Sequence, residues 1–386
     1  MTISAFNPPA RVLLGPGPSE VPARVLLAMA KPTIGHMDPA FIGMMEEVKT
    51  LLQYAFQTTN AATLPISAPG SAGMEACLAN LIEPGDKVAV CRNGVFGGRM
   101  GDIVERLGGV PLWVDNAFGE AVDPDKLADA LKKTRDVRLV AFVHAETSTG
   151  VLSDARAIAE VAHRFGALVL ADTVTAIGGV PLYVDKWELD VAYAGTQKCL
   201  SCPPGLAPLT LSERALHRIR NRRDKPRTWF LDLSLLLGYW GTGKRVYHHT
   251  APINLLYGLH EALRMLEEEG IENAWQRHRR IHEALVVGLE PLGLGISVAP
   301  DIRLPQLNSV SIPAGVDDAQ VRARLLEEWG IEIGGGLGEL AGRIWRIGLM
   351  GQGSNIRNVT LCLDALKVAL GTALIEKDLD AKAVPT

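Results

Sequence analysis

The chain has 386 residues, a net charge of −4 at pH 7 and a hydrophobic fraction of 47%. This length predicts about two domains, and the composition is ordinary for a folded soluble enzyme. A slightly acidic chain carries no charge signature of a protein that binds nucleic acid or an anionic membrane. Five cysteines in so long a chain argue against a disulfide-stabilised scaffold.

Membrane and targeting segments are not expected. No stretch of the sequence approaches the ~18 uninterrupted apolar residues that a membrane span needs. Residues 1–9 have neither the basic nor the apolar region of a secretion signal, and the last residues, Ala383-Val-Pro-Thr386, are not a peroxisomal ending. We therefore expect a cytoplasmic location.

The region from about 60 to 215 alternates apolar strand-like runs with helix-like segments. Strands are expected at 87–91, 110–114, 137–143, 167–171, 191–194 and 207–211, and helices at 74–81, 97–107, 123–133 and 154–165. Continuous apolar strands that alternate with helices predict an α/β fold, with a mostly parallel sheet covered on both faces.

The second half of the chain has a different pattern. Residues 251–291 favour long helices, and strands near 307–312 and 343–347 flank a helix at 317–328. A final helix is expected from Ile356 to about Leu370, followed by a loosely ordered polar tail. This pattern predicts a smaller α+β domain.

Two residues at strand ends carry the strongest chemical signal. Asp172 follows the run 167–171, and Lys198 follows the run 191–194. Ligands of open parallel sheets bind outside the carboxyl ends of the strands, where both side chains are expected. A lysine can form a Schiff base with an aldehyde cofactor, while an aspartate holds the proton of a pyridinium nitrogen.

Three further segments near these strands have two interpretations each. Gly70, Ser71 and Ala72 form a small-residue turn before a helix, which is either a phosphate site or a plain tight turn. Phe96 follows another strand and is either a ring that stacks on a planar cofactor or a core residue. Thr147 either donates a hydrogen bond to a cofactor oxygen or closes a local turn.

Two motifs lie in the second half. Tyr247-His-His-Thr250 is a polar loop that either binds phosphate across a subunit interface or is ordinary surface. Arg346 lies inside an apolar strand, where its planar fork suits either a substrate carboxylate or an internal salt bridge.

A zinc site is the weakest interpretation. Cys199 and Cys202 form a C-x-x-C, and His144 and Glu146 precede them, in faint likeness to zinc deaminases. Lysine rather than proline stands before the first cysteine, so two small thiols beside a site are the simpler interpretation, and no metal is expected.

Several strings in matching order give the chain a resemblance over nearly its whole length. They are Gly15-Pro-Gly-Pro-Ser19, Glu146-Thr-Ser-Thr-Gly-Val151, Gly195-Thr-Gln-Lys198, Pro203-Pro-Gly205, Tyr247-His-His-Thr250 and Arg346-Ile-Gly348. Together they resemble the class V aminotransferases of the fold type I pyridoxal-phosphate enzymes, in the alanine–glyoxylate, serine–pyruvate and serine–glyoxylate group.

The resemblance implies a role for each matched residue. Lys198 would be the Schiff-base lysine, and Asp172 would bind the pyridine nitrogen, with Val174 on the ring face. Thr147 and Gln197 would contact the phenolate side, and Phe96 holds the place of the family's frequent stacking tryptophan. The phosphate would be bound by Gly70, Ser71 and Gln197, together with Tyr247 and Thr250 of a partner subunit. Ser71 stands where relatives often have histidine. Arg346 would hold the substrate carboxylate. The loop around Gly15 and Gly17 would crowd the small side chain of the substrate.

The resemblance also implies an architecture and an activity. A large cofactor domain of residues 20–265, built on a seven-stranded type of sheet, would join a small domain of residues 266–386 with segment 1–19. The activity would be transfer of the amino group of L-alanine or L-serine to glyoxylate or pyruvate, in a homodimer with shared active sites. The alternatives are an aminoethylphosphonate or pyridoxamine–pyruvate transaminase, or a cysteine desulfurase-like lyase.

Overall fold

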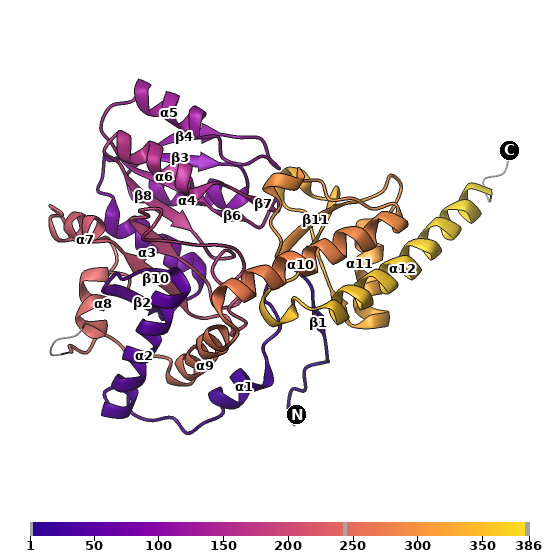
Figure 1. Cartoon of the computed structure of the whole chain (residues 1–386), viewed down its shortest axis with the longest axis horizontal. Coiled ribbons are helices and arrows are strands. Elements are labelled where there is room, and N and C mark those ends of the chain that lie inside the picture. Colours follow the sequence, from indigo (N-terminus) through magenta and orange to yellow (C-terminus); the bar gives the residue numbers. More distant parts are fainter. Residues whose placement is uncertain (1–2, 242–244, 383–386) are drawn as a thin grey trace.

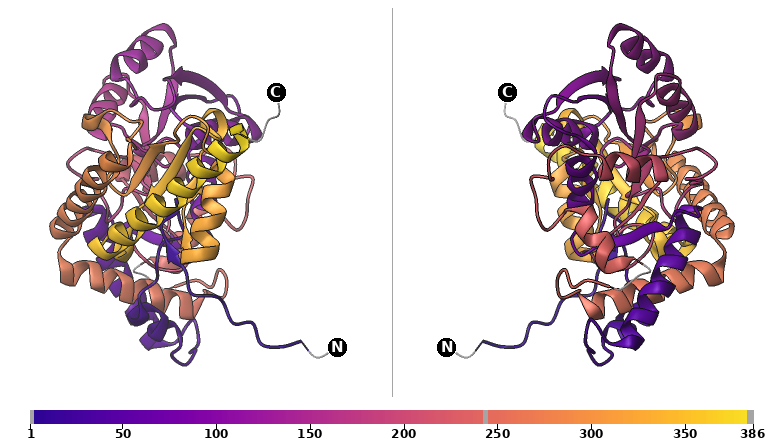
Figure 2. Two further views of the ribbon diagram at one scale, coloured as in Figure 1. Left: turned by 90° about the vertical axis from the view of Figure 1, so that its right-hand side faces the viewer. Right: turned by 90° about the vertical axis from the view of Figure 1, so that its left-hand side faces the viewer.

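A computed structural model describes residues 3–241 and 245–382. Figure 1 shows two regions, a larger one that contains the first half of the chain and a smaller one that contains most of the last third. Residues 3–11 are exposed and run away from the body, as the side views show (Figure 2).

The core of the large region is a mostly parallel sheet, which confirms the predicted α/β fold. Within the described chain it has seven strands in the order β2 (Ala62–Ile66), β10 (Ala207–Leu211), β9 (Val191–Tyr193), β8 (Leu168–Asp172), β5 (Val137–Val143), β3 (Lys87–Arg92) and β4 (Val110–Asp115). Only β10 is antiparallel to its neighbours. Every residue of β2, β9 and β10 is buried, so this part of the sheet is covered on both faces.

Several helices of the large region begin at side-chain caps. The helices of this region are α1 (Ala23–Met29), α2 (Pro39–Phe56), α3 (Gly70–Leu81), α4 (Val95–Arg106), α5 (Pro124–Lys133), α6 (Ala155–Arg164), α7 (Glu213–Arg220), α8 (Leu233–Trp240) and α9 (Ile253–Glu269). The Asp123 carboxylate accepts the backbone N–H of Asp125 at 2.8 Å, and Pro124 takes the first helical position. Such caps satisfy N–H groups that have no partner inside the helix.

The smaller region has its own sheets and core. Its elements are β1 (Val12–Leu13), α10 (Ile271–Leu289), β11 (Leu307–Ser311), α11 (Asp318–Trp329), β12 (Ile331–Glu332), β13 (Gly334–Gly335), β14 (Ile344–Gly348) and α12 (Ile356–Lys382). In the described residues β11, β14 and β13 form an antiparallel sheet, and β1 pairs in parallel with β12. Leu14 belongs to the hydrophobic cluster of this region. The domain boundaries near 20 and 266 stay predictions.

Element bounds differ from the predictions in two informative places. Helix α3 begins at Gly70 rather than at Met74, so the small-residue turn is itself the first helical turn. Helix α12 continues to Lys382, where a loosely ordered tail was predicted after Gly371. The tail sequence is rich in alanine, leucine, glutamate and lysine, and it contains no proline before Pro385, so its composition favours helix over coil.

A short hairpin completes the described fold. β6 (Ala145–Glu146) pairs with β7 (Val151–Leu152) directly after β5. It presents the segment 147–150 beside the carboxyl ends of the parallel strands. Over the described residues, no helix has the length and apolarity to cross a membrane.

Candidate active site

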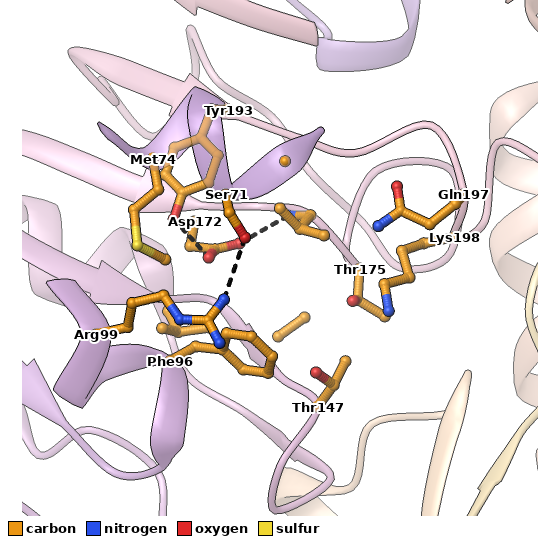
Figure 3. A pocket seen from close by; sticks show the side chains of 14 residues that line it. Ser71, Met74, Phe96, Arg99, Thr147, Asp172, Thr175, Tyr193, Gln197 and Lys198 are labelled. Carbon is orange, nitrogen blue, oxygen red and sulfur yellow. Dashed lines mark hydrogen bonds between the residues drawn. The ribbon is translucent and has the colours of Figure 1, made fainter. Parts of the chain in front are cut away.

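The carboxyl ends of the parallel strands surround one pocket. It encloses about 550 Å³ of empty space, part of it open to solvent. The predicted site residues that line it are Gly70, Ser71, Phe96, Thr147, Asp172, Val174, Gln197 and Lys198. They lie at or after the ends of β2, β3, β5, β8 and β9, and the side chains of this set that Figure 3 labels surround one space.

Asp172 is the last residue of β8 and is buried. Its Oδ1 accepts the backbone N–H of Val174 at 2.9 Å, and its Oδ2 accepts the hydroxyl of Tyr193 at 2.5 Å. Burial raises the pKa of Asp172 to about 6, against the opposing effect of the Tyr193 hydrogen bond. At neutral pH Asp172 is therefore a carboxylate, held in one orientation by two donors.

Lys198 lies at the opposite side of the pocket from Tyr193 (Figure 3). Its Nζ donates a hydrogen bond to the carbonyl oxygen of Pro16. Burial is the main reason that the pKa of Lys198 falls to about 8, and the charge of Arg346 lowers it further. About a tenth of this amine is therefore uncharged, and thus nucleophilic, at pH 7, far more than for a lysine of ordinary pKa.

A buried glutamate ties two walls of the pocket together. Glu146 accepts hydrogen bonds from the hydroxyl of Ser148 at 2.6 Å and from the backbone N–H of Phe96 at 3.2 Å. Burial raises the pKa of Glu146, and its charge contributes to the raised pKa of Asp172. Glu146 thus fixes the start of α4, which carries Phe96, against the segment that carries Thr147.

The N-terminus of α3 opens into the pocket at Gly70 and Ser71. The first N–H groups of a helix have no acceptor within the helix, and the helix dipole favours an anion there. Ala72 differs from the other two, because its N–H donates to the carbonyl of Pro69 at 2.8 Å and its side chain does not line the pocket. The predicted phosphate role therefore has structural support at Gly70 and Ser71 but not at Ala72.

Arg346 reaches the site from the small region. It is buried in the middle of β14, and its Nε donates to the carbonyl of Gly335 at 2.7 Å, while its Nη1 donates to the carbonyl of Thr147 at 3.3 Å. No carboxylate of the described residues forms an ion pair with it, so the alternative of an internal salt bridge is wrong for this part of the chain.

The glycine segment that precedes α1 covers the lysine. A Cβ atom added at Gly17 would lie 2.5 Å from Nζ of Lys198, and the φ angle of Gly17 is +109°. Gly15 lies farther back, against the small region, where its carbonyl would meet any side chain at Gly348. Gly17 thus brings the backbone close to the amine of Lys198, whereas Gly15 packs against backbone atoms of the small region.

Tyr247 and Thr250 are not part of this pocket. Both are exposed, Tyr247 with 59% of its surface accessible, and Tyr247 packs instead near the ring of His36, with centroids 5.2 Å apart. Their assignment to the phosphate site of a partner subunit stays a prediction.

The pocket also contains residues for which the sequence suggested no role. They are Met74, Arg99, Thr175 and Tyr193, with Val143 and Ala145 from the strand and hairpin that precede Thr147. Tyr193 lies beside Asp172 in the parallel ladder of β8 and β9. A tyrosine inside an otherwise apolar strand is a signal that could have drawn attention to it, since a buried hydroxyl needs a partner.

The residues present fit pyridoxal phosphate. The side-chain oxygen of Gln197 is buried and has no hydrogen-bond partner among the described residues. A turn of this amide by 180° would offer a donor in the same place. An aromatic ring, a carboxylate, an amine of lowered pKa and a helix N-terminus complete a donor set for a pyridine ring, an aldehyde and a phosphate.

Comparison with known proteins places this geometry in a family. The chain is 41% identical to an alanine–glyoxylate aminotransferase of Callithrix jacchus, over 94% of this chain and 88% of that protein. It is 39% identical to a (S)-ureidoglycine–glyoxylate transaminase of Bacillus subtilis, over 94% of this chain and 91% of that one. The structure of an alanine–glyoxylate aminotransferase from Nostoc sp. superposes with a TM-score of 0.94 at 46% identity, covering 96% and 98% of the two chains.

The model of the aminotransferase class-V family matches residues 11–341. This match and the identities above confirm the resemblance that the motifs indicated, and the chain belongs to the class-V aminotransferases.

Proposed function

We propose that this aminotransferase uses pyridoxal phosphate, carried by Lys198, to transfer the amino group of L-alanine or L-serine to glyoxylate or pyruvate. One observation carries the proposal. The amine of Lys198, whose pKa is lowered, and the carboxylate of Asp172 line one pocket, and Arg346, which forms no ion pair with the described residues, donates to the carbonyl of Thr147 in the pocket wall.

When bound, the cofactor supplies an aldehyde that takes up the amino group and a ring that accepts electrons. Asp172 would hold a proton at the ring nitrogen, because its carboxylate lines the pocket and is charged at neutral pH. Nζ of Lys198, once free, takes the proton from Cα of the amino acid. Arg346 orients the α-carboxylate and thereby sets which Cα bond faces that amine.

The substrate side chain has little room. Pro16 and Gly17 lie directly over the lysine amine, so a side chain that extends toward them meets backbone. This crowding favours donors such as alanine and serine. The names of the two relatives share glyoxylate and differ in the amino donor. They therefore support glyoxylate as the acceptor more strongly than they support L-alanine or L-serine as the donor.

The proposed assembly is a homodimer whose sites are shared. Tyr247 and Thr250 would reach the phosphate of the partner subunit, which agrees with their exposure and with their absence from the lining of the pocket in their own chain.

The test is the visible absorbance of the purified, cofactor-loaded protein. L-alanine or L-serine should remove the visible absorbance band of the bound cofactor, with release of the keto acid that matches the donor. Glyoxylate should then restore the band. The (S)-ureidoglycine named for the Bacillus subtilis relative is the third donor to compare. A band that none of these donors changes would contradict the proposed donors while leaving the family assignment intact.

A cysteine desulfurase-like activity is disfavoured by the cysteines themselves. All five are buried and none lines the pocket. Burial raises the pKa of Cys199, which adjoins the lysine, to about 12, so it is a protonated, enclosed thiol rather than a mobile nucleophile. Release of sulfide from L-cysteine, lost in a Cys199→Ala variant, would overturn this conclusion.

A further inference from the structure

Arg99 is a cationic residue of the pocket that the proposed mechanism does not use. It lies in α4, one helical turn after Phe96, and its side chain extends toward α3. Its Nη1 donates to the hydroxyl of Ser71 at 3.1 Å, and its Cζ lies 4.9 Å from the centroid of the Phe96 ring. Figure 3 shows the guanidinium beside that ring and directed at Ser71.

The charge of Arg99 is not neutralised by its neighbours. Arg92 and Arg106 flank it in the sequence, and they form ion pairs with Asp115 at 2.7 Å and with Asp102 at 2.9 Å. Among the described residues no carboxylate forms such a pair with Arg99, whose recorded partners are a hydroxyl and an aromatic ring. Its positive charge is therefore free to bind an anion at the place where Ser71 lies.

The neighbouring N-terminus of α3 is suited to an anion but brings no full charge. Gly70, Ser71 and Gln197 are all neutral, and Lys198 is committed to the aldehyde in the proposed function. A phosphate ester carries close to two negative charges at neutral pH, and a planar guanidinium matches its oxygens in pairs. Arg99 is the remaining cation among the residues that line the pocket.

We propose that Arg99 binds the phosphate group of the cofactor, together with Ser71 and the N-terminus of α3. This inference rests on the proposed function, because it requires a phosphorylated pyridine cofactor in this pocket. Arg99 also packs on Phe96, so the same side chain that binds the phosphate supports the ring expected to stack on the pyridine.

The test compares two ligands that differ only in the phosphate. Cofactor-free wild-type protein and the Arg99→Gln variant are titrated with pyridoxal phosphate and with pyridoxal, and binding is followed by absorbance and by protein fluorescence. The substitution should lower the affinity for pyridoxal phosphate at least about tenfold, because a charged hydrogen bond is lost. It should change the affinity for pyridoxal less than about twofold. Arg99→Lys should fall between, since it keeps the charge and loses the fork.

Matched controls separate this role from general effects on the helix. Arg106→Gln removes a cation of the same helix that is already paired with Asp102, and it should leave the affinity for both ligands unchanged. Inorganic phosphate should raise the melting temperature of the cofactor-free wild type and of Arg106→Gln, but not that of Arg99→Gln.

Two outcomes would overturn the inference. An equal loss of affinity for both ligands would show that Arg99 acts only by supporting Phe96, and unchanged affinity for pyridoxal phosphate would show that it is not a ligand. Failure of the proposed function would look different, because a wild-type protein that binds pyridoxal phosphate tightly but transfers no amino group would leave the role of Arg99 standing.

Discussion

Lys198 and Asp172 are buried ionisable groups, and their environments move their pKa values in directions that suit their proposed tasks. Burial disfavours the charged form of each, so the amine of Lys198 loses its proton more easily and the carboxyl of Asp172 loses its proton less easily. The first change makes a nucleophile near neutral pH. The second is limited by the donors Tyr193 and Val174, which keep Asp172 charged above about pH 6.

The lysine can be tested through the pH dependence of cofactor uptake. Only the uncharged amine attacks an aldehyde, so the rate constant for uptake of pyridoxal phosphate by cofactor-free protein should rise with pH, with a midpoint at about 8, and level off about one pH unit higher. Stopped-flow absorbance gives this rate constant. The same measurement with acetyl-lysine that has a free side-chain amine shows how much of the pH dependence comes from ionisation of the cofactor itself. A midpoint as high as that of acetyl-lysine would contradict the lowered pKa.

The hydrogen bond that Tyr193 donates to Asp172 can be tested through its effect on the stability of the protein at different pH values. The folded-state pKa of about 6 lies above the ordinary aspartate value of 3.8, so Asp172 favours the folded state less as pH rises from about 4 to 6. Above that range the buried carboxylate depends on its donors. We expect Tyr193→Phe to cost about 1–3 kcal/mol at pH 8 and clearly less at pH 5, where the carboxyl is protonated.

The matched control for this prediction is Tyr54→Phe. The hydroxyl of Tyr54 accepts the backbone N–H of Ile271 at 2.8 Å, a neutral partner. Its loss should lower the melting temperature of the cofactor-free protein by the same amount at both pH values. Equal pH profiles for the two variants would show that the charge of Asp172 does not depend on Tyr193.

At the scale of elements, the segment between β1 and α1 is the part of the site with the least steric freedom. Ser19 donates its hydroxyl to the carbonyl of Lys198 at 2.6 Å and its N–H to the carbonyl of Gln197 at 2.8 Å. These two bonds hold the segment against the lysine loop, and they explain why Gly17 has no room for a side chain.

We therefore expect Gly17→Ala to impair cofactor loading severely. The new methyl group would overlap the lysine amine, and the positive φ angle adds strain for any residue with a Cβ. Gly43→Ala is the control, since Gly43 lies within α2 with open space around it and should gain about 0.5–1 kcal/mol of stability. Absorbance titrations with pyridoxal phosphate and thermal melts measure both effects, and normal loading of Gly17→Ala would refute the steric argument.

The sequence predicted those site residues that local patterns mark. Asp172, Lys198 and Thr147 each follow a continuous apolar run, and the carboxyl edge of a parallel sheet brings such positions together. Arg99 and Tyr193 were not predicted, because both lie inside regular elements. Their position in the pocket depends on the packing of α4 beside α3 and on the register of β8 with β9, which no local pattern encodes.

The direction of strands was also beyond local reasoning. The run Ala207–Leu211 predicts a strand as well as any other, but its antiparallel direction between β2 and β9 follows from the path of the whole chain. The bounds of β5 and β10 agree with the predictions to the residue, because their apolar runs end abruptly at polar or turn residues.

At the scale of the whole molecule, the site combines groups from both regions and, in the proposed dimer, from two chains. Arg346 belongs to the sheet of the small region, whereas Lys198 and Asp172 follow strands of the large one. The exposed Tyr247 and Thr250 give the chain unused polar groups for a neighbouring site.

Hybrid dimers test whether those groups act in the partner's site. A Lys198→Ala chain and a Tyr247→Ala/Thr250→Ala chain should each have little activity alone. After mixing and subunit exchange, hybrids should contain one site with all three residues intact, and activity should recover to about a quarter of the wild-type value for random association. No recovery, with hybrids verified by mass, would mean that Tyr247 and Thr250 act within their own chain, and full activity of the Tyr247→Ala/Thr250→Ala chain alone would mean that they act in neither site.

The pairing of β1 with β12 has a consequence for how the N-terminus can be altered. Leu14 donates its N–H to the carbonyl of Glu332 at 2.9 Å and accepts the N–H of Gly348 at 2.8 Å, and only four residues separate it from Ser19 on the lysine loop. The first eleven residues precede this bridge, so tags, leaders or deletions that end before Val12 leave it untouched. A deletion that passes Leu14 would remove the hydrogen bonds by which this segment joins the arginine strand to the lysine loop, and the damage would appear at the catalytic centre rather than at the end of the molecule.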